Sequence, residues 1–248
     1  MLRGLYTAGN ALLTQTNRMD VVANNLSNAQ TAGYKADTVV SRSFDDLLME
    51  RINDPGVNAY KQVGPTNPGI HVDQVMIDFM QGAIEQTARN TDFALIGDGF
   101  FEVSTPNGTR YTRAGNFQLN SEGELLTAEG YSIMGEDGAV KVNPDNFSVN
   151  SDGEIFSDGV NVNKFKIFDF ADKNQLRKEK SGLFMSNQAG FRANNVVVRQ
   201  SALEASNIDL NKEYVTMLEI ARSTESNQKI IQMMDQTLGR AVNDIGRV

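Results

Sequence analysis

The chain has 248 residues, 40% of them hydrophobic and 22% charged, a balance typical of a folded protein with one or two packing units. It contains no cysteine, which excludes disulfides, thiolate nucleophiles and cysteine-based metal sites. The formal net charge is −8 and no window is rich in lysine or arginine, so we predict no nucleic-acid partner.

The N-terminal segment does not resemble a signal peptide. Polar residues, among them Thr7, Asn10 and Thr14, interrupt any apolar region of the required length. No other stretch reaches the roughly 18 to 20 apolar residues that span a bilayer. We therefore expect no membrane insertion and no cleaved leader.

The first 33 residues are predicted to form one helix, from Leu2 to about Asn28, with Gly33 as its stop. Its apolar residues recur at steps of seven with one intermediate position, which is typical of a coiled-coil seam. The seam residues are Leu5, Leu12, Met19, Val22 and Leu26.

Charge is scarce in this N-terminal region. Residues 1 to 34 carry three charged side chains, Arg3, Arg18 and Asp20, whereas 22% of 34 residues would be about seven. A solvated helix usually carries lysine and glutamate on its outer face. We therefore expect the first helix to be packed between neighbouring copies of the chain.

Residues 34–81 are predicted to be a connector, partly irregular, with a short helical signal from Phe44 to Ile52 followed by loop markers. Residues 82–200 are predicted to form an antiparallel β-rich domain, because Asx-Gly and Glu-Gly pairs separate short β-type runs. These pairs are Asp98-Gly99, Asn107-Gly108, Glu122-Gly123, Glu129-Gly130, Asp137-Gly138, Asp152-Gly153 and Asp158-Gly159.

Residues 201–248 repeat the seven-residue pattern more strongly, and we predict a helix from about Asn207 to Asn243, with Ser206 and Asp209 at its start. Its many charged residues favour a face in contact with water. The seam residues are Leu210, Met217, Ile220, Ile231, Met234, Leu238 and Ile245, and Leu203 extends the same spacing. The fold class is therefore α+β, an antiparallel β-rich central domain with a coiled-coil pair of terminal helices.

We find no pattern that predicts a catalytic, cofactor-binding or metal site. The only histidine, His71, alternates with apolar residues as an exposed strand residue does. Gly97-Asp98-Gly99 lacks the third glycine of a dinucleotide fingerprint and favours a hairpin turn before core aromatics. Asn150-Ser151-Asp152-Gly153-Glu154 lacks the spacing of a calcium loop and favours a turn.

Two other function classes stay open on these grounds. Paired carboxylates among the 31 acidic residues could serve a carbohydrate-active enzyme. Alternatively, the helices could bind a different protein, as in an adaptor or chaperone.

Four motifs stand in order along the chain and closely resemble the signatures of the flagellar basal-body rod and hook protein family. They are Ala23-Asn24-Asn25-Leu26-Ser27-Asn28 with Thr31, Gly33, Tyr34 and Lys35; Gly97-Asp98-Gly99-Phe100-Phe101-Glu102-Val103; Tyr111-Thr112-Arg113-Ala114-Gly115-Asn116-Phe117; and Leu203-Glu204-Ala205-Ser206-Asn207-Ile208-Asp209-Leu210.

The resemblance implies a structural subunit with no enzymatic activity and no cofactor. Such a subunit is exported through the flagellar type III apparatus without a cleaved leader. It stacks with copies of itself and with other rod and hook subunits into the hollow, torque-transmitting shaft of the basal body. The terminal helices would form the inner tube, and the C-terminal helix would line its channel.

Within the family, residues Asp46 to Gly56 resemble the distal rod protein more than the hook protein, and the modest length also disfavours the hook. However, Ile220-Ala221-Arg222-Ser223-Thr224-Glu225 lacks an aromatic residue that the family often has there. A proximal rod or hook-type axial protein is therefore the alternative.

Overall fold

The computed structural model describes residues 2–51, 61–144, 146–193 and 195–245. The chain divides into two compact units. Unit 1 comprises Met1–Leu26, Asp37–Met76 and Leu210–Val248, and unit 2 comprises Ser27–Ala36 and Ile77–Asp209. The α+β class and both terminal helices are confirmed.

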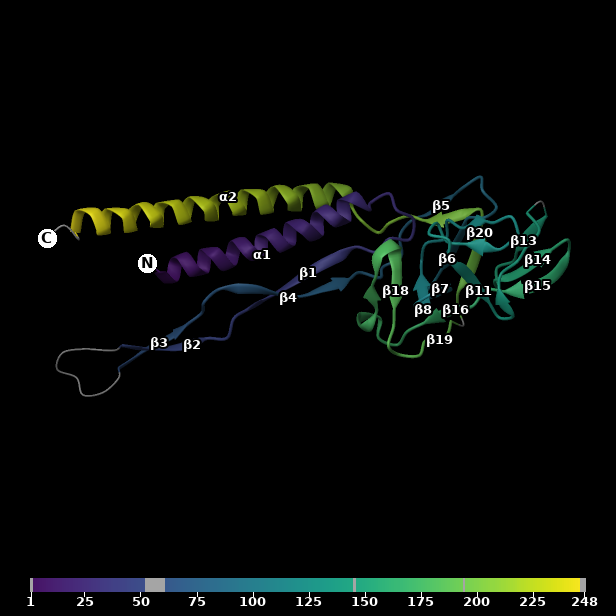
Figure 1. Cartoon of the computed structure of the whole chain (residues 1–248), viewed down its shortest axis with the longest axis horizontal. Coiled ribbons are helices and arrows are strands. Elements are labelled where there is room, and N and C mark those ends of the chain that lie inside the picture. The colour runs from purple at the N-terminus through teal and green to yellow at the C-terminus, as the bar shows by residue number, and fades with distance from the viewer. Residues whose placement is uncertain (1, 52–60, 145, 194, 246–248) are drawn as a thin grey trace. The chain divides into compact units, whose positions relative to one another are not determined.

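Two long helices dominate unit 1, α1 (Leu2–Ser27) and α2 (Leu210–Arg240), and a π-helical turn, η3 (Ala241–Ile245), follows α2. They lie side by side in Figure 1, and the Gln15 amide of α1 donates to the Ser223 hydroxyl of α2 at 3.3 Å. The two helices therefore lie side by side within this unit, and the coiled-coil pairing of their apolar stripes stays a prediction.

The C-terminal helix begins three residues later than predicted. The Asn207 side chain accepts a hydrogen bond from the Ala36 amide at 2.8 Å and donates to the Asp78 carbonyl at 2.8 Å. These long-range bonds hold the approach to the helix extended, which a local capping pattern cannot reveal. Leu203, which was counted with the helical spacing, lies in a strand.

The connector in unit 1 is an extended two-stranded ribbon (Figure 1). Strand β1 (Asp37–Ser43) pairs with β4 (Ile70–Ile77), and β2 (Leu47–Arg51) pairs with β3 (Lys61–Thr66). The predicted helical turn from Phe44 to Ile52 is therefore wrong, because β2 satisfies its backbone groups by pairing with β3. Ile52 itself lies outside the described residues.

The described residues of unit 2 form short antiparallel strands in four sheets. The largest has the order β17-β18-β8-β7-β11-β10-β9, with β12 beside β11, β16 beside β7 and β19 beside β16. The others are β13-β14-β15, β20-β6 and β21-β5. The bounds are β5 Ile84–Gln86, β6 Phe93–Ile96, β7 Phe100–Thr105, β8 Gly108–Thr112, β9 Gln118–Leu119, β10 Leu125–Leu126, β11 Ser132–Gly135, β12 Gly138–Ala139, β13 Phe147–Val149, β14 Glu154–Ser157, β15 Val160–Lys164, β16 Ile167–Asp169, β17 Arg177–Lys178, β18 Leu183–Met185, β19 Phe191–Arg192, β20 Val197–Gln200 and β21 Ala202–Glu204, with 3₁₀ turns at Lys173–Gln175 and Lys180–Gly182.

The predicted hairpin turns are confirmed at six of the seven pairs, all except Asp98-Gly99. The glycines of the other pairs adopt positive φ angles between paired antiparallel strands, for example +103° at Gly108 between β7 and β8. Asp98-Gly99 instead joins β6 and β7, which belong to different sheets. There the chain crosses between sheets, and the prediction of a hairpin at this point is wrong.

The core of unit 2 is aromatic. Phe93 and Phe101 lie in its larger cluster and each packs on Phe117 and on Phe165, with ring centroids 5.2 to 6.0 Å apart. Phe100 points into a second cluster that also contains Phe170, Leu176 and Phe184. The two successive phenylalanines therefore face opposite sides of β7, as alternation along a strand requires.

Candidate functional site

The predicted seam residues lie on the less exposed sides of the two helices. Val22 and Ile220 are buried, and Leu210 is exposed. The side chain of Ile245 lies outside the described residues. The partly buried seam residues are Leu5, Leu12, Met19, Leu26, Met217, Ile231, Met234 and Leu238.

Polar contacts also contribute to the helix pair. The Asn25 amide donates to the Glu213 carboxylate at 3.3 Å and to the Asp37 carbonyl at 2.8 Å, so this one residue ties α1 to both α2 and β1. Thr14 is buried and its hydroxyl donates to the Ile70 carbonyl at 3.2 Å. Knobs-into-holes packing between the helices stays a prediction.

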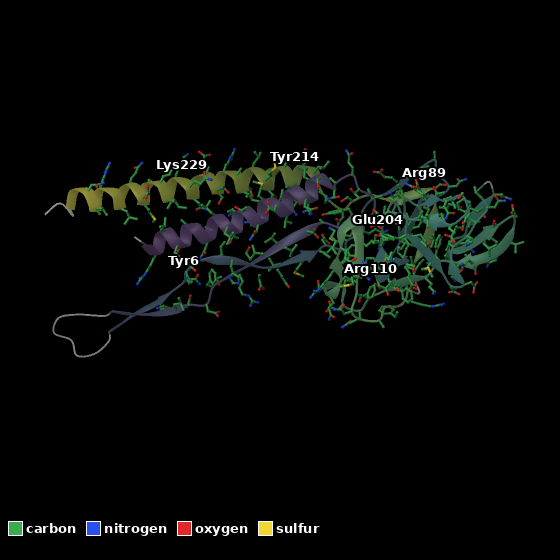
Figure 2. The ribbon with its side chains drawn as sticks, in the orientation of Figure 1. Tyr6, Arg89, Arg110, Glu204, Tyr214 and Lys229 are labelled. Carbon is green, nitrogen blue, oxygen red and sulfur yellow. The ribbon has the colours of Figure 1, made fainter. Side chains whose placement is uncertain are left out.

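A second set of apolar side chains, which the sequence reasoning missed, is exposed on the helices. Tyr6 on α1 and Tyr214 on α2 are both labelled in Figure 2. Spacing could have revealed the set, since Tyr6 and Leu13 are seven residues apart on one face. We call this set the outer apolar residues: Tyr6, Leu13, Tyr214, Val215, Leu218 and Met233.

Three charged residues from three of the motifs meet inside unit 2, around Glu204, which Figure 2 labels. The Lys35 ammonium lies 2.5 Å from Glu204 Oε1, and the Arg113 guanidinium lies 3.2 Å from Glu204 Oε2. The exposed side-chain fractions of Lys35, Arg113 and Glu204 are 1%, 3% and 0%. We call these residues the buried ion-pair cluster.

Further hydrogen bonds complete this cluster. Lys35 also donates to the Met80 carbonyl at 2.8 Å, and Arg113 donates to the Gly97 carbonyl at 2.7 Å. The Gly82 amide donates to Glu204 Oε1 at 3.0 Å. Burial lowers the pKa of Lys35, and the bond to Glu204 opposes this shift, because a neighbouring carboxylate favours the charged ammonium.

The glycines of the motifs allow close approach of backbone around the cluster. A Cβ atom on Gly33, whose φ is +67°, would lie 2.4 Å from the Arg113 carbonyl carbon. A Cβ atom on Gly115 would lie 1.7 Å from the Phe93 carbonyl oxygen. Both positions therefore require glycine for reasons of space.

Most of the other motif residues make packing contacts or hydrogen bonds within the fold. Tyr34 is buried with the Lys178 ammonium 3.5 Å from its ring centroid, and Tyr111 packs on Phe170 with ring centroids 4.8 Å apart. The Thr31 amide donates to the Asn28 carbonyl, the Ala114 amide to the Thr112 hydroxyl and the Ile208 amide to the Ser206 hydroxyl. Gly99 is buried, Leu203 is half-buried, and Ala23 and Asn24 are exposed.

The residues considered for other chemistry show no assembled site. His71 lies in β4, as predicted, but it is half-buried, because its ring packs on Phe44 at a centroid distance of 4.5 Å. Asn150 accepts hydrogen bonds from the Asp152 and Glu154 amides, which confirms a turn. Within the described ranges, no group of three acidic or histidine side chains could hold a metal ion. None of the described helices is long and apolar enough to cross a membrane.

Comparison with known proteins finds the same three regions that carry the motifs. Residues 5–35 match the flagella basal body rod protein family, residues 94–157 the D1 domain of the flagellar hook proteins FlgE, FlgF and FlgG, and residues 199–244 the C-terminal region of the FlgE, FlgF and FlgG rod proteins.

Full-length relatives agree with these matches. The chain is 31% identical to the flagellar hook-basal body complex protein FlhO of Bacillus subtilis over 100% of both chains. It is 33% identical to the basal-body rod protein FlgG of the same organism, over 98% of this chain and 99% of that protein. The rod protein FlgF of Caulobacter vibrioides is 30% identical over 100% of both chains. With three motif regions matched and relatives aligned from end to end, the chain belongs to the family of flagellar basal-body rod proteins.

Proposed function

We propose that this chain is a distal rod subunit that assembles with its neighbours through the outer apolar residues of α1 and α2. As a member of the rod family the chain is a structural subunit of the basal body and not an enzyme. Assembly with other axial proteins, the rod and hook subunits, is how rod proteins act. The proposal concerns which surface carries that assembly.

The observation that carries the proposal is the exposure of large apolar side chains on both helices. Leu13 has 64% of its surface exposed, and Val215 and Leu218, three residues apart on α2, each have 56% exposed. Burying one such side chain contributes roughly 1.5 to 3 kcal/mol. Exposed apolar patches mark interaction surfaces in soluble proteins.

The charge distribution supports a different role for each helix. On α1 the exposed charged side chains are Arg3 and Asp20, and the other exposed polar side chains, such as Thr16 and Asn17, are neutral. By contrast, α2 exposes charged residues along its length, including the ion pair of Lys229 with Glu225 at 2.6 Å. We infer that α1 packs between subunits and that α2 borders an aqueous channel in the shaft.

Two finer assignments belong to the proposal. The distal position is favoured by the resemblance of residues 46–56 to the distal rod protein, although residues 52–56 lie outside the described part of the chain. Imaging basal bodies from cells that lack this gene tests it, because only the distal segment of the rod should be missing. Loss of the proximal segment as well would assign the chain there. We also propose that the flagellar type III apparatus exports the chain without cleavage, which mass measurement of the assembled subunit tests.

Leu13→Asp is expected to abolish rod assembly while leaving the monomer folded. The side chain is already exposed in the monomer, so a carboxylate there costs little before assembly. In the assembled rod the same carboxylate would be buried without a partner, which proteins avoid. Electron microscopy of basal bodies and swimming of cells that express only the variant measure the effect.

The matched control is Val160→Asp, since Val160 is also 64% exposed but lies in β15 of unit 2. This variant should be secreted and assembled into rods, and cells that express it should swim normally. Secretion of both variants into the medium is measured in parallel, so that an export defect is recognised. Normal swimming with Leu13→Asp would refute the proposed surface.

A further inference from the structure

The segments that lead out of α1 and into α2 are bound to each other within unit 2. Gly33, which follows α1, donates its amide hydrogen to the Glu204 carbonyl at 2.7 Å. The Ala36 amide donates to the side chain of Asn207, three residues before the start of α2 at Leu210, at 2.8 Å. Residues far apart in sequence are thus joined close to where each helix connects to unit 2.

Glu204 is the residue that these bonds share. Its backbone lies in β21, which pairs with β5, and its carbonyl accepts from Gly33. Its carboxylate accepts from Lys35 on the α1 side, and from Gly82 and Arg113 in the body of unit 2. A carboxylate offers about four acceptor positions, and three donors from three segments use them here.

We propose that Glu204 is a positioning residue for rod assembly, which clamps the segment after α1 to the segment before α2 so that the adjoining helix turns are paired before a neighbour docks. The proposal rests on the proposed assembly function. At those turns the Asn25 amide already donates to the Glu213 carboxylate at 3.3 Å.

The physical gain from such a clamp is entropic. A subunit whose helix ends are already paired has less conformational freedom to lose when it docks. The neighbour then meets one prepared surface instead of two independent helices. Loss of the clamp should therefore weaken assembly even where unit 2 stays folded.

A purely stabilising role makes a different prediction. Buried ion pairs can often be replaced by apolar side chains of similar size without loss of stability. The triple variant Lys35→Met, Arg113→Met and Glu204→Leu removes every charge of the cluster together. If the cluster only stabilises unit 2, this variant should behave as the native protein.

The first experiment measures amide hydrogen exchange in the full-length triple variant. We expect exchange at Gly33 and Ala36 to become at least tenfold faster than in the native protein. Exchange at the core amides of Leu125 and Val140, which bond within the β structure, should not change. Unchanged exchange at Gly33 and Ala36 would overturn the clamp.

A second variant keeps the test decisive if the triple variant does not fold. Asn207→Ala removes the acceptor of the Ala36 amide but leaves the buried charges in place. It should accelerate exchange at Ala36 by at least tenfold while exchange at Gly33, whose amide bonds to the Glu204 carbonyl, stays unchanged. Equal acceleration at Gly33 would overturn the role of Glu204 in holding the segment after α1. Its matched control is Asn150→Ala, which removes a turn-forming asparagine elsewhere in unit 2 and should leave Ala36 unchanged.

The last experiment compares assembly of the folded clamp variants with that of Leu13→Asp. Faster exchange together with missing rods supports the clamp as a positioning device. Faster exchange with normal rods overturns its role in assembly and leaves the proposed function intact. Normal rods with Leu13→Asp would instead refute the outer apolar surface, whatever the exchange results.

Discussion

Glu204→Gln is expected to lower the free energy of unfolding of unit 2 by about 3 to 5 kcal/mol. Glutamine keeps the size of the side chain but leaves Lys35 and Arg113 as buried cations without a counter-ion. Each cation has lost its hydration, and no carboxylate then compensates for the loss. Urea unfolding of the full-length protein, followed by circular dichroism of the β structure, measures the change.

The loss of unfolding free energy in Glu204→Gln should depend on pH, and the direction of this dependence follows from the pKa of Lys35. Burial already lowers the pKa of Lys35 below 10.5, and removing Glu204 should lower it further, because the carboxylate favours the charged form. Between the lowered pKa of Lys35 in the folded chain and its ordinary value of 10.5, the unfolded chain binds more protons than the folded one, so stability rises with pH in that range. The variant should therefore recover part of its loss as the pH is raised through the window between the two lowered pKa values.

The control for this prediction is Glu124→Gln. Glu124 also forms an ion pair, with Lys141 at 2.9 Å, but 58% of the lysine side chain is exposed. Water screens such a pair, so the unfolding midpoint should hardly move. Equal midpoint shifts in the two variants would contradict the special role of burial at Glu204.

Gly115→Ala is expected to destabilise unit 2 by about 3 kcal/mol or more, at the upper end of overpacking effects. The new methyl group would lie 1.7 Å from the Phe93 carbonyl oxygen and 2.7 Å from the Phe93 carbonyl carbon. Both are backbone atoms, and the Phe93 side chain is fully buried in the aromatic core. Neither residue can move without disturbing β6, and thermal unfolding measures the cost.

Gly239→Ala is the matched control for this glycine. No atom lies within 4 Å of the position that its methyl group would occupy, and Gly239 is within α2. Alanine favours a helix over glycine by up to about 1 kcal/mol, so α2 should become slightly more stable. Equal destabilisation in both glycine variants would contradict the clash at Phe93 as the cause.

Local features of the fold could be read from the sequence. Pairs such as Asn107-Gly108 predicted hairpins correctly because a tight turn is decided by the φ angles of two residues. The seven-residue spacing from Leu5 to Leu26 predicted a helix correctly, because periodicity places those side chains on one face.

Features that depend on a distant partner were missed. Leu47–Arg51 was expected to be helical, but β3 supplies its hydrogen-bond partners. Asp98-Gly99 has the composition of a hairpin turn, yet the strands on its two sides join different sheets. In both places the composition permits two structures, and pairing with another segment selects one.

The sequence identified the residues of the buried ion-pair cluster separately, without indicating that they form one site. Lys35, Arg113 and Glu204 were each identified within a motif, but Lys35 and Glu204 are separated by 169 residues, and nothing local indicates that they touch. The outer apolar residues do not follow from the seam spacing, because they lie on other faces of the two helices and their exposure depends on what packs there.

By itself, the sequence determined the terminal helices, the antiparallel hairpins of the central region and the absence of cysteine chemistry. Each of these depends on residue type, or on spacing within a few turns of chain. The tertiary structure alone decided which charges are buried together and which helix faces stay exposed. Those outcomes depend on many weak contacts between distant segments, and no short window of sequence contains their sum.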